Sequence, residues 1–487
     1  MKLEPPMTLS RPSAAASARA RGGAKVEVLS PLAGEATRRL HGEGPRYVAA
    51  APVRLDIMGG VSEYCGALVL GMTAEDHVCA AAQKRNDGKI SLSLPHVPGE
   101  SNGRLDWEIA AVELHHQASH STGESGDGAK QGKSGVIRRC VLGALVEGLR
   151  ANVLPAFQGG MALAAASTLG DLTTAGGEAA LTVATLVSAA AALNRTPTPE
   201  DGVSVCRKVR KAWLGRLTGA ADPIVSSSGE RFSLIGIRSD AGAVDEIVPL
   251  PDGLQIAGVD LGSVCAETEI RFGRVRTAAF MGRLLIDRII QHDELRNIDW
   301  DGHLSGIRVS DFVSHFRDRL PTKIMGADFL EKFGETGDPL TTIDPSETYK
   351  IRSRTEHHIY EHARSLRLSN LISQWNRDVA SDDALVEAGE LLAASHWSYG
   401  QRCGLGCAEA DRLVTLIRRH GRTRGIFGAK ITSCGCGGTV AVLMRSTDEA
   451  ADALNEAVNE YSAGAARSAR IFSGSRSGAL VEGARSL

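Results

Sequence analysis

Alternating apolar and polar segments along the chain predict a mixed fold of strands and helices. A β-type run over 47–51 leads, through a Gly-Gly turn, to a second buried strand over 66–72. Apolar residues recur at helical spacing over 137–154, and the alanine-rich pattern over 178–193 is typical of a closely packed helix. Another amphipathic helix is predicted over 207–217. The first half of the chain therefore combines strands with several helices.

Beyond residue 232 the pattern changes to strands and then to helices. A long helical pattern covers 275–291, and the polar, proline-containing stretch 293–353 predicts short helices and loops. The later elements are predicted as helices over 383–397 and 409–419, a strand, glycine-rich loop and strand over 428–444, and a helix over 448–461. The sequence shows no internal repeat.

The length of the chain indicates two domains, because 487 residues exceed the usual size of one hydrophobic core. We expect a disordered tail over 1–25, a first domain over 26–231 and a second domain over 232–487. Arginines in the tail leave a transit peptide open as an alternative. The segment 115–134 is dense in Gly, Ser and His and predicts a flexible surface insertion in the first domain.

Histidines and cysteines raise a metal-binding alternative. The histidines of the insertion could bind a metal, but its composition favours a solvated loop. Two cysteine pairs lack the paired spacing of a zinc site, so zinc is the minor alternative there as well. The residues concerned are His115, His116, His120, Cys403, Cys407, Cys434 and Cys436. The nine cysteines are scattered, which favours reduced thiols and a cytoplasmic location over a disulfide framework.

The charge balance narrows the class of partner. The chain has 55 Lys and Arg against 57 Asp and Glu, and no basic face dominates a long stretch. Nucleic acid and anionic membranes are therefore not expected as partners, and no apolar run is long enough to span a bilayer. A small-molecule partner fits this composition best, with the protein acting as a monomer or homodimer.

The most informative local pattern is the glycine-rich segment Gly428–Thr439 (GAKITSCGCGGT), which precedes the apolar run VAVLM. Clustered glycines let the backbone approach a ligand closely, or let one strand turn tightly beside another. A plain hairpin turn is the alternative to a ligand-binding loop.

The segment Ala51–Met72 (APVRLDIMGGVSEYCGALVLGM) resembles the opening sugar-binding motif of galactokinases, and especially of L-arabinokinases, in the GHMP small-molecule kinase superfamily. Val53 stands where the family has Gly. Glu63 stands where the family has an Asp that binds sugar hydroxyls, so the resemblance implies sugar binding by Gly60, Glu63 and Tyr64.

A second segment, Leu217–Glu230, is similar to the family segment that contains the proposed catalytic base, which is Asp222 in this chain. The next residue is Pro223, where the family has Gln. The resemblance implies that Asp222 accepts or orients the proton of the sugar hydroxyl. It also implies that Arg54 stabilises charge on the transferring phosphoryl group and lowers the basicity of Asp222. Further similarity covers 260–283 and 396–414.

The segment of this chain that aligns with the phosphate-binding motif differs most from the family pattern. The aligned stretch Gly170–Ala180 (GDLTTAGGEAA) keeps the length and the Ala-rich helix but lacks the family's Pro, loop glycines and serines. By resemblance, ATP phosphates would be bound here and at the glycine-rich segment, by Thr173, Thr174, Gly176, Gly177, Gly435, Gly437 and Gly438. Glu178 could bind Mg²⁺, or it could be a favourable first-turn residue that repels the triphosphate.

Together these resemblances imply the α+β, two-domain GHMP kinase fold, with a ribosomal-protein-S5-like N-terminal domain and a ferredoxin-like C-terminal domain. The implied activity is that of an ATP-dependent sugar 1-kinase for L-arabinose or a galactose-type monosaccharide, with ATP and Mg²⁺ as cofactors. The alternative is a catalytically degenerate pseudokinase that binds a sugar or a nucleotide in a regulatory role.

Overall fold

The computed structural model describes residues 31–40, 44–95, 104–119, 132–217, 219–238, 242–265, 267–375, 382–465 and 468–487. The predicted tail over 1–25 and the histidine His120 lie outside these ranges. No helix within them is long and apolar enough to cross a membrane.

The first half of the chain is organised by a mixed sheet. Its strands follow the order β14, β1, β2, β5, β3, β4, and β6 pairs with β2 and β7. β3 and β5 run parallel, whereas the other neighbouring strands are antiparallel. The strands are β1 (Tyr47–Met58), β2 (Leu68–Arg85), β3 (Lys89–Pro95), β4 (Arg104–Ala110), β5 (Gly160–Ser167), β6 (Ser233–Arg238), β7 (Ala243–Pro249) and β14 (Arg485–Ser486).

Strand β2 continues to Arg85, well past the predicted end at residue 72. Its buried alanines Ala80 and Ala81 pair with Ala165 and Ala164 of β5. These small residues have only a weak preference for strands. Pairing with a strand on each side and burial stabilise the strand instead.

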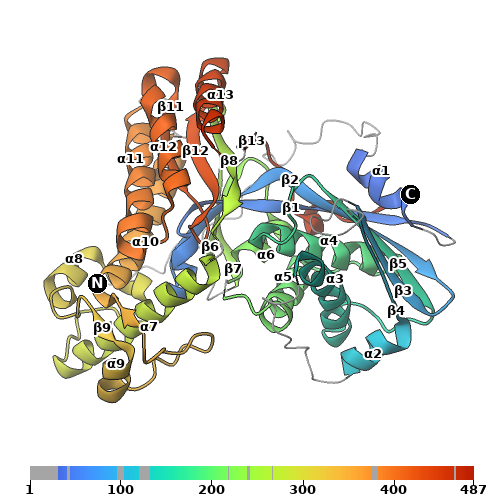
Figure 1. Ribbon diagram of the computed structural model, residues 1–487, viewed down its shortest axis with the longest axis horizontal. Coiled ribbons are helices and arrows are strands. Elements are labelled where there is room, and N and C mark those ends of the chain that lie inside the picture. The colour runs from blue at the N-terminus through green and yellow to red at the C-terminus, as the bar shows by residue number, and fades with distance from the viewer. Residues whose placement is uncertain are drawn as a thin grey trace, which may run out of the picture.

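Helices cover the sheet. α4 lies on β1 and β2, as Figure 1 shows, and the predicted alanine-rich helix is confirmed. Its alanines, Ala179, Ala180, Ala184 and Ala189 among them, are fully buried, because small side chains allow a close approach to the strands. The helices of this half are α1 (Pro31–Arg38), η2 (Gly60–Cys65), α2 (Ala111–Ser119), α3 (Gly132–Arg150), α4 (Ala175–Ala192), α5 (Pro199–Lys208), η4 (Val209–Trp213) and α6 (Ala221–Ser228).

The predicted flexible insertion over 115–134 is wrong at both ends, because helix α3 begins at Gly132. Residues up to Ser119 belong to helix α2. His115 Nε2 lies 2.9 Å from the carbonyl oxygen of Phe157, and the two rings are in edge-to-face contact. This contact orders a histidine that composition alone had placed in a loop.

The second half is built on a four-stranded antiparallel sheet in the order β11, β12, β8, β13. In Figure 1 its upright helices stand beside the sheet, and α7 runs below them toward the first half. The elements are β8 (Leu254–Val264), α7 (Thr268–His292), α10 (Ile351–Trp375), α11 (Asp383–Ser398), η7 (Tyr399–Cys403), α12 (Ala408–His420), η8 (Arg422–Arg424), β11 (Ile426–Ile431), β12 (Gly437–Arg445), α13 (Asp448–Ala463) and β13 (Arg470–Phe472).

The polar stretch 293–353 forms short helices and loops, as its sequence predicts. Phe312, Phe316 and Phe329 are fully buried and give this stretch a small core of its own with α7 and α10. The elements are η5 (Leu304–Gly306), α8 (Val309–Asp311), η6 (Phe312–Phe316), β9 (Ile324–Met325), α9 (Gly326–Phe333) and β10 (Thr348–Tyr349).

The predicted domain boundary at residue 231 stays a prediction, and the strands of the first sheet extend beyond it. β6 and β7 lie after this residue and still pair with β2 and with each other. The C-terminal β14 pairs with β1, and the preceding helix α14 (Ala479–Glu482) packs on α6. Both ends of the described chain therefore contribute to the first sheet and its covering layer.

We predict that Gly282→Ala lowers the melting temperature. Gly282 is where α7 meets α10, and an added methyl group would overlap the Thr355 hydroxyl, which typically costs about 1–3 kcal/mol. Gly273→Ala on the same helix is the control, because its methyl group would meet Leu217 Cδ1 at an ordinary 3.5 Å. Thermal unfolding followed by circular dichroism measures both variants, and equal melting temperatures would contradict the prediction.

Candidate active site

The centre of the candidate site is an ion pair between the two predicted catalytic residues. Arg54 Nε donates to Asp222 Oδ1 at 2.7 Å, and both side chains are buried. Arg54 lies on β1 and Asp222 at the start of α6, separated by 168 positions in the sequence. The fold therefore brings the first and second motifs into direct contact.

A second arginine holds the other oxygen of Asp222. Arg210 of η4 donates from Nη1 to Asp222 Oδ2 at 2.7 Å, and its side chain is also buried. Burial alone would raise the pKa of Asp222, but Coulombic attraction to Arg54 and Arg210 outweighs it and holds this pKa well below its ordinary value. Asp222 is therefore ionised throughout the physiological pH range.

Asp56 extends the charged cluster to the second half of the molecule. It follows Arg54 by two positions on β1, and Arg54 Nη1 donates to its Oδ1 at 2.7 Å. Its Oδ2 accepts from the backbone N–H of Ser433 at 2.9 Å and lies 3.9 Å from Lys430 Nζ. One fully buried carboxylate thus joins β1 to the glycine-rich segment.

Lys430 is a fully buried amine behind this segment. Its Nζ makes no hydrogen bond within the described part of the chain, and it lies 4.7 Å from the centre of the Tyr399 ring. Burial lowers the pKa of Lys430, against the opposing attraction of Asp56.

The glycine-rich segment forms a tight turn between β11 and β12. Ser433, Gly435, Cys436, Gly437 and Gly438 all have positive φ. A side chain at Gly435 would collide with the Leu405 carbonyl, which accepts the Cys436 N–H at 2.6 Å. Close packing therefore explains Gly435, and phosphate binding by Gly435, Gly437 and Gly438 stays a prediction.

The N-terminus of α4, where the resemblance predicts phosphate binding, is occupied by local contacts. Thr174 caps the helix by accepting the Gly177 N–H at 3.2 Å, and Thr173 donates its hydroxyl to Asp171. Gly176 lies close to Val53, where an added side chain would come within 3.3 Å. The roles of these residues in nucleotide binding stay predictions.

Glu178, the predicted metal ligand, is fully buried and bound to an arginine. Arg216 Nε lies 3.1 Å from both of its carboxylate oxygens, and Arg216 Nη2 donates to one of them. Burial raises the pKa of Glu178, although Arg216 opposes this effect. The described residues contain no cluster of three or more His, Cys, Asp or Glu suited to a metal ion, and Mg²⁺ binding by Glu178 stays a prediction.

The predicted sugar-binding residues lie beside Asp222. Glu63 Oε1 accepts the backbone N–H of Ala221 at 2.7 Å, which connects η2 to the first residue of α6. Tyr64 packs against Phe272, and its hydroxyl lies 3.0 Å from His358 Nε2. A side chain on Gly60 would collide with the Asp56 carboxylate, so the close approach of this carboxylate explains Gly60.

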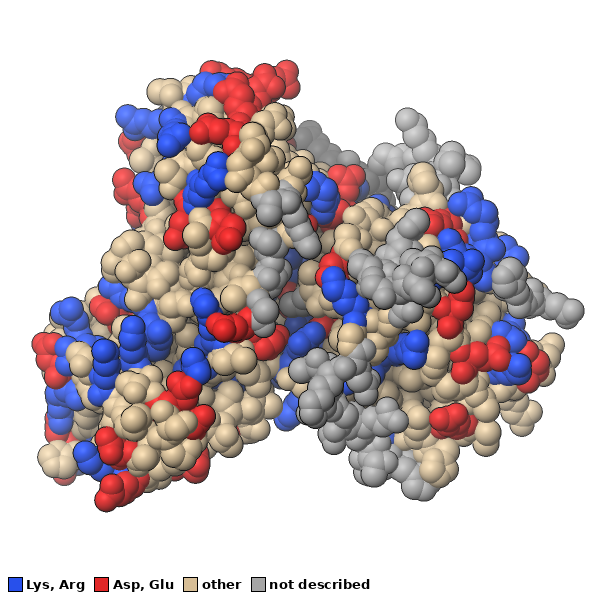
Figure 2. Space-filling view, viewed as in Figure 1, with Lys and Arg blue, Asp and Glu red and all other residues tan. Residues whose placement is uncertain are grey.

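A pocket of about 740 Å³ opens at these residues. Glu63, Tyr64 and Gly219 form one side, and the basic residues Arg207, Lys208, Lys211 and Arg216 form another. Arg276, Pro339 and Leu340 close it from the second half of the chain. In Figure 2, Lys and Arg atoms appear on the walls of the groove that divides the molecule.

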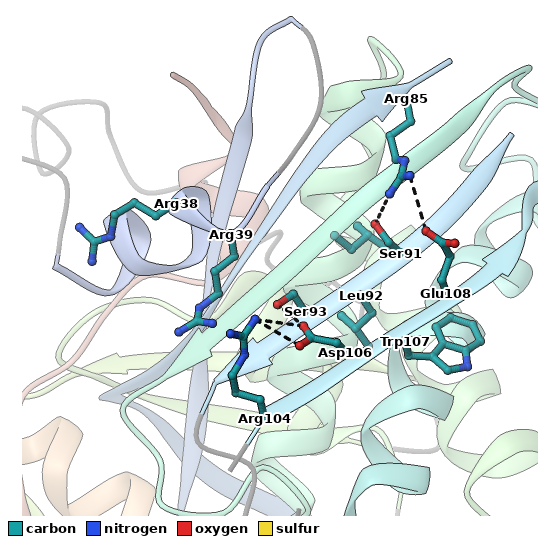
Figure 3. Close-up of a pocket in the computed structure, with 11 residues that line it drawn as sticks. Arg38, Arg39, Arg85, Ser91, Leu92, Ser93, Arg104, Asp106, Trp107 and Glu108 are labelled. Atoms are coloured by element: carbon teal, nitrogen blue, oxygen red, sulfur yellow. Dashed lines mark hydrogen bonds and ion pairs between the residues drawn. The ribbon is translucent and has the colours of Figure 1, made fainter. Parts of the chain in front are cut away.

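A second hollow, of about 660 Å³, lies on the first sheet and contains none of the predicted site residues. Figure 3 shows partners for two of its four arginines: Arg85 contacts Ser91 and Glu108, and Arg104 contacts Asp106. Because the predicted sugar-binding residues Glu63 and Tyr64 line the other pocket, we take that pocket as the candidate active site.

Sequence reasoning missed four charged residues of the site: Asp56, Arg210, Arg216 and Lys430. Asp56 was detectable, because residues two positions apart on a strand share a face and it follows Arg54 by two. Arg210 and Arg216 meet their carboxylate partners 12 and 38 positions away, which leaves no local pattern. Lys430 was part of a recognised motif, but nothing in the sequence marked its amine as buried.

Comparisons with known proteins find chains of similar sequence and fold. No protein-family model matches the chain. L-arabinokinase of Arabidopsis thaliana is 26% identical over 487 aligned residues, which cover 89% of this chain and 46% of the relative. Galactokinase of Bacillus subtilis (strain 168) is 28% identical over 109 residues, covering 22% of this chain and 25% of that protein. The chain therefore spans about half the length of the L-arabinokinase that it matches.

Solved structures share the fold. Lactococcus lactis galactokinase, solved in complex with galactose, has a TM-score of 0.65 at 18% identity and covers 91% of this chain and 95% of its own. Methanococcus jannaschii mevalonate kinase has a TM-score of 0.55 at 14% identity, with 90% and 99% covered. The predicted two-domain α+β fold is confirmed.

The charge on Asp222 predicts a pH dependence of stability. Because the folded-state pKa is lowered, ionised Asp222 stabilises the folded chain above about pH 4, and this contribution is lost as the pH falls toward the folded-state pKa. The difference in unfolding free energy between wild type and Asp222→Asn should therefore shrink below about pH 4. Urea unfolding over a pH series measures it, with the exposed Asp299→Asn as the control. A difference that stays constant or grows on acidification would refute the assignment.

Proposed function

Because the chain belongs to the GHMP kinase superfamily, in its galactokinase and L-arabinokinase branch, we propose that it is an ATP-dependent sugar 1-kinase. It would transfer the γ-phosphoryl group to the anomeric hydroxyl of L-arabinose or a galactose-type monosaccharide. The observation that carries this proposal is the buried Arg54–Asp222 pair beside the pocket that contains Glu63.

In this proposal Asp222 orients the sugar hydroxyl. A carboxylate has about four lone-pair sites, so each oxygen of Asp222 can accept a further hydrogen bond beside its arginine. A carboxylate with so low a pKa is a weak base. Weak basicity suffices in a loose transition state, where the hydroxyl keeps its proton until late in the transfer.

The positive charge for phosphoryl transfer would come from arginines. Arg54 reaches the reacting centre through Asp222, and Arg216 is partly exposed where it lines the pocket. Preorganised cations in a partly desolvated pocket stabilise charge that develops on phosphoryl oxygens.

A second candidate function is a sugar-binding pseudokinase. The observation that favours it is that guanidinium groups hold both carboxylates that phosphoryl transfer would use. Arg210 binds Asp222, and Arg216 binds Glu178. If neither ion pair opens, a sugar could still bind at Glu63 while transfer fails.

We predict that the wild type releases ADP in a sugar-dependent manner and that Asp222→Asn abolishes turnover. Asn keeps the size of the side chain and its hydrogen bonding, so sugar affinity should change little. A coupled assay with ATP, Mg²⁺ and either L-arabinose or D-galactose measures turnover, and calorimetry measures sugar binding. Asp76→Asn is the matched control, because this buried carboxylate pairs with Arg470 outside the pocket. Wild-type turnover in Asp222→Asn would sink the catalytic assignment, and sugar binding without turnover by the wild type would establish the second candidate.

Glu178→Gln tests the role of the Glu178–Arg216 pair. Removing the charge of Glu178 frees Arg216 for phosphate, and a charge-assisted hydrogen bond typically strengthens binding by about tenfold or more. We therefore expect Glu178→Gln to bind ATP more tightly than wild type, with unchanged dependence on Mg²⁺. Calorimetry with and without Mg²⁺ measures both effects. Loss of Mg²⁺-dependent ATP binding in the variant would instead make Glu178 a metal ligand, as the sequence suggested.

A further inference from the structure

One wall of the pocket carries basic side chains without acidic partners. Arg207 and Lys208 end α5, and Lys211 follows in η4. All three are exposed, and none forms an ion pair with a carboxylate in the described ranges of the chain. The spacings of three and four residues place Lys211 on the same helical face as Lys208 and Arg207.

The other two cations of this pocket are already neutralised. Arg216 pairs with Glu178, and Arg276 binds both oxygens of Asp338 at 2.7 Å. The acids on the pocket wall are Glu63, bound to the Ala221 N–H, and the exposed Glu200. The three unpaired cations therefore leave an excess of positive charge.

The hollow of Figure 3 carries fewer unpaired cations. Three of its four arginines have carboxylate partners, Arg39 with Glu35, Arg85 with Glu108 and Arg104 with Asp106. Basic residues in a last helical turn also interact favourably with the helix dipole, which accounts for Arg207 and Lys208 at the end of α5. Lys211 is likewise in the last turn of η4, so the dipole is favourable for all three residues. The dipole does not explain why all three line the same pocket.

A concave wall with an excess of one charge concentrates the field within the pocket and favours a ligand of opposite sign. We propose that the monosaccharide bound here carries an anionic substituent, either the carboxylate of a sugar acid or a phosphate ester. Its ring hydroxyls lie toward Glu63, and its anionic group contacts Lys208 and Lys211. This inference rests on the proposed sugar site and specifies the class of sugar.

The test is calorimetry in the absence of nucleotide. The ligands are D-galacturonate, D-galactose 6-phosphate, neutral D-galactose and inorganic phosphate. The protein variants are wild type, Lys208→Gln/Lys211→Gln and the charge-matched control Arg38→Gln/Arg104→Gln, whose residues line the hollow of Figure 3. All these side chains are exposed, so the variants are expected to fold.

One of the two anionic sugars should bind wild type at least tenfold more tightly than D-galactose. Preference for D-galacturonate would identify the anionic substituent as a carboxylate, and preference for D-galactose 6-phosphate would identify it as a phosphate ester. The lysine variant should lose this preference while its affinity for D-galactose is unchanged, and the control should behave as wild type. The preference should also weaken with added salt, because these cations are exposed.

Three outcomes would overturn the inference: equal affinity for the neutral and anionic sugars, no effect of the lysine substitutions, or inorganic phosphate binding as tightly as the anionic sugars. A parallel ATP titration identifies the other source of negative charge. If the lysine variant weakens ATP binding but not anionic-sugar binding, the wall serves the nucleotide and the inference fails.

Turnover separates this inference from the proposed kinase activity. Tight binding of an anionic sugar without phosphorylation supports the inference and removes the kinase proposal. Phosphorylation of D-galactose with no preference for an anionic sugar supports the kinase proposal and removes the inference.

Discussion

The site depends on one chain of buried charges that runs from Asp222 through Arg54 to Asp56 and on to the Ser433 N–H. Each link is between 2.7 and 2.9 Å, and the carboxylates at both ends of Arg54 are buried. An isolated charge in such a place is strongly destabilising, whereas a charge with a well-placed partner is tolerated. The second motif, the first strand and the glycine-rich turn are thereby held in one arrangement.

The same constraint explains residues that look like ligand-binding glycines in the sequence. A side chain does not fit at Gly60 because the Asp56 carboxylate lies against it, and none fits at Gly435 because the Leu405 backbone lies there. Glycine at both positions allows the two halves of the molecule to approach closely enough for Asp56 to reach Ser433. At Gly60 and Gly435 close packing is thus a sufficient cause without a bound ligand.

Much of the fold and half of the site followed from sequence, for identifiable reasons. The alanine-rich composition of 178–193 favoured a helix, and the motifs at 51–72 and 217–230 resembled a known pattern, so α4, Arg54 and Asp222 were predictable. Strand β2 past residue 72 was not, because its alanines become a strand only through pairing with β5. Arg210 and Arg216 were not predictable either, since an ion pair across the fold leaves no local signature.

The two arginines limit how chemistry can proceed at this site. A guanidinium does not lose its proton at any pH at which the chain folds, so Arg210 and Arg216 cannot release Asp222 and Glu178 by titration. Release requires a competing anion or a movement of η4 and the following residues that hold both arginines. Lys208 and Lys211 lie on the same stretch of chain as Arg210, so the anion proposed to bind them would contact the segment that holds Arg210 against Asp222.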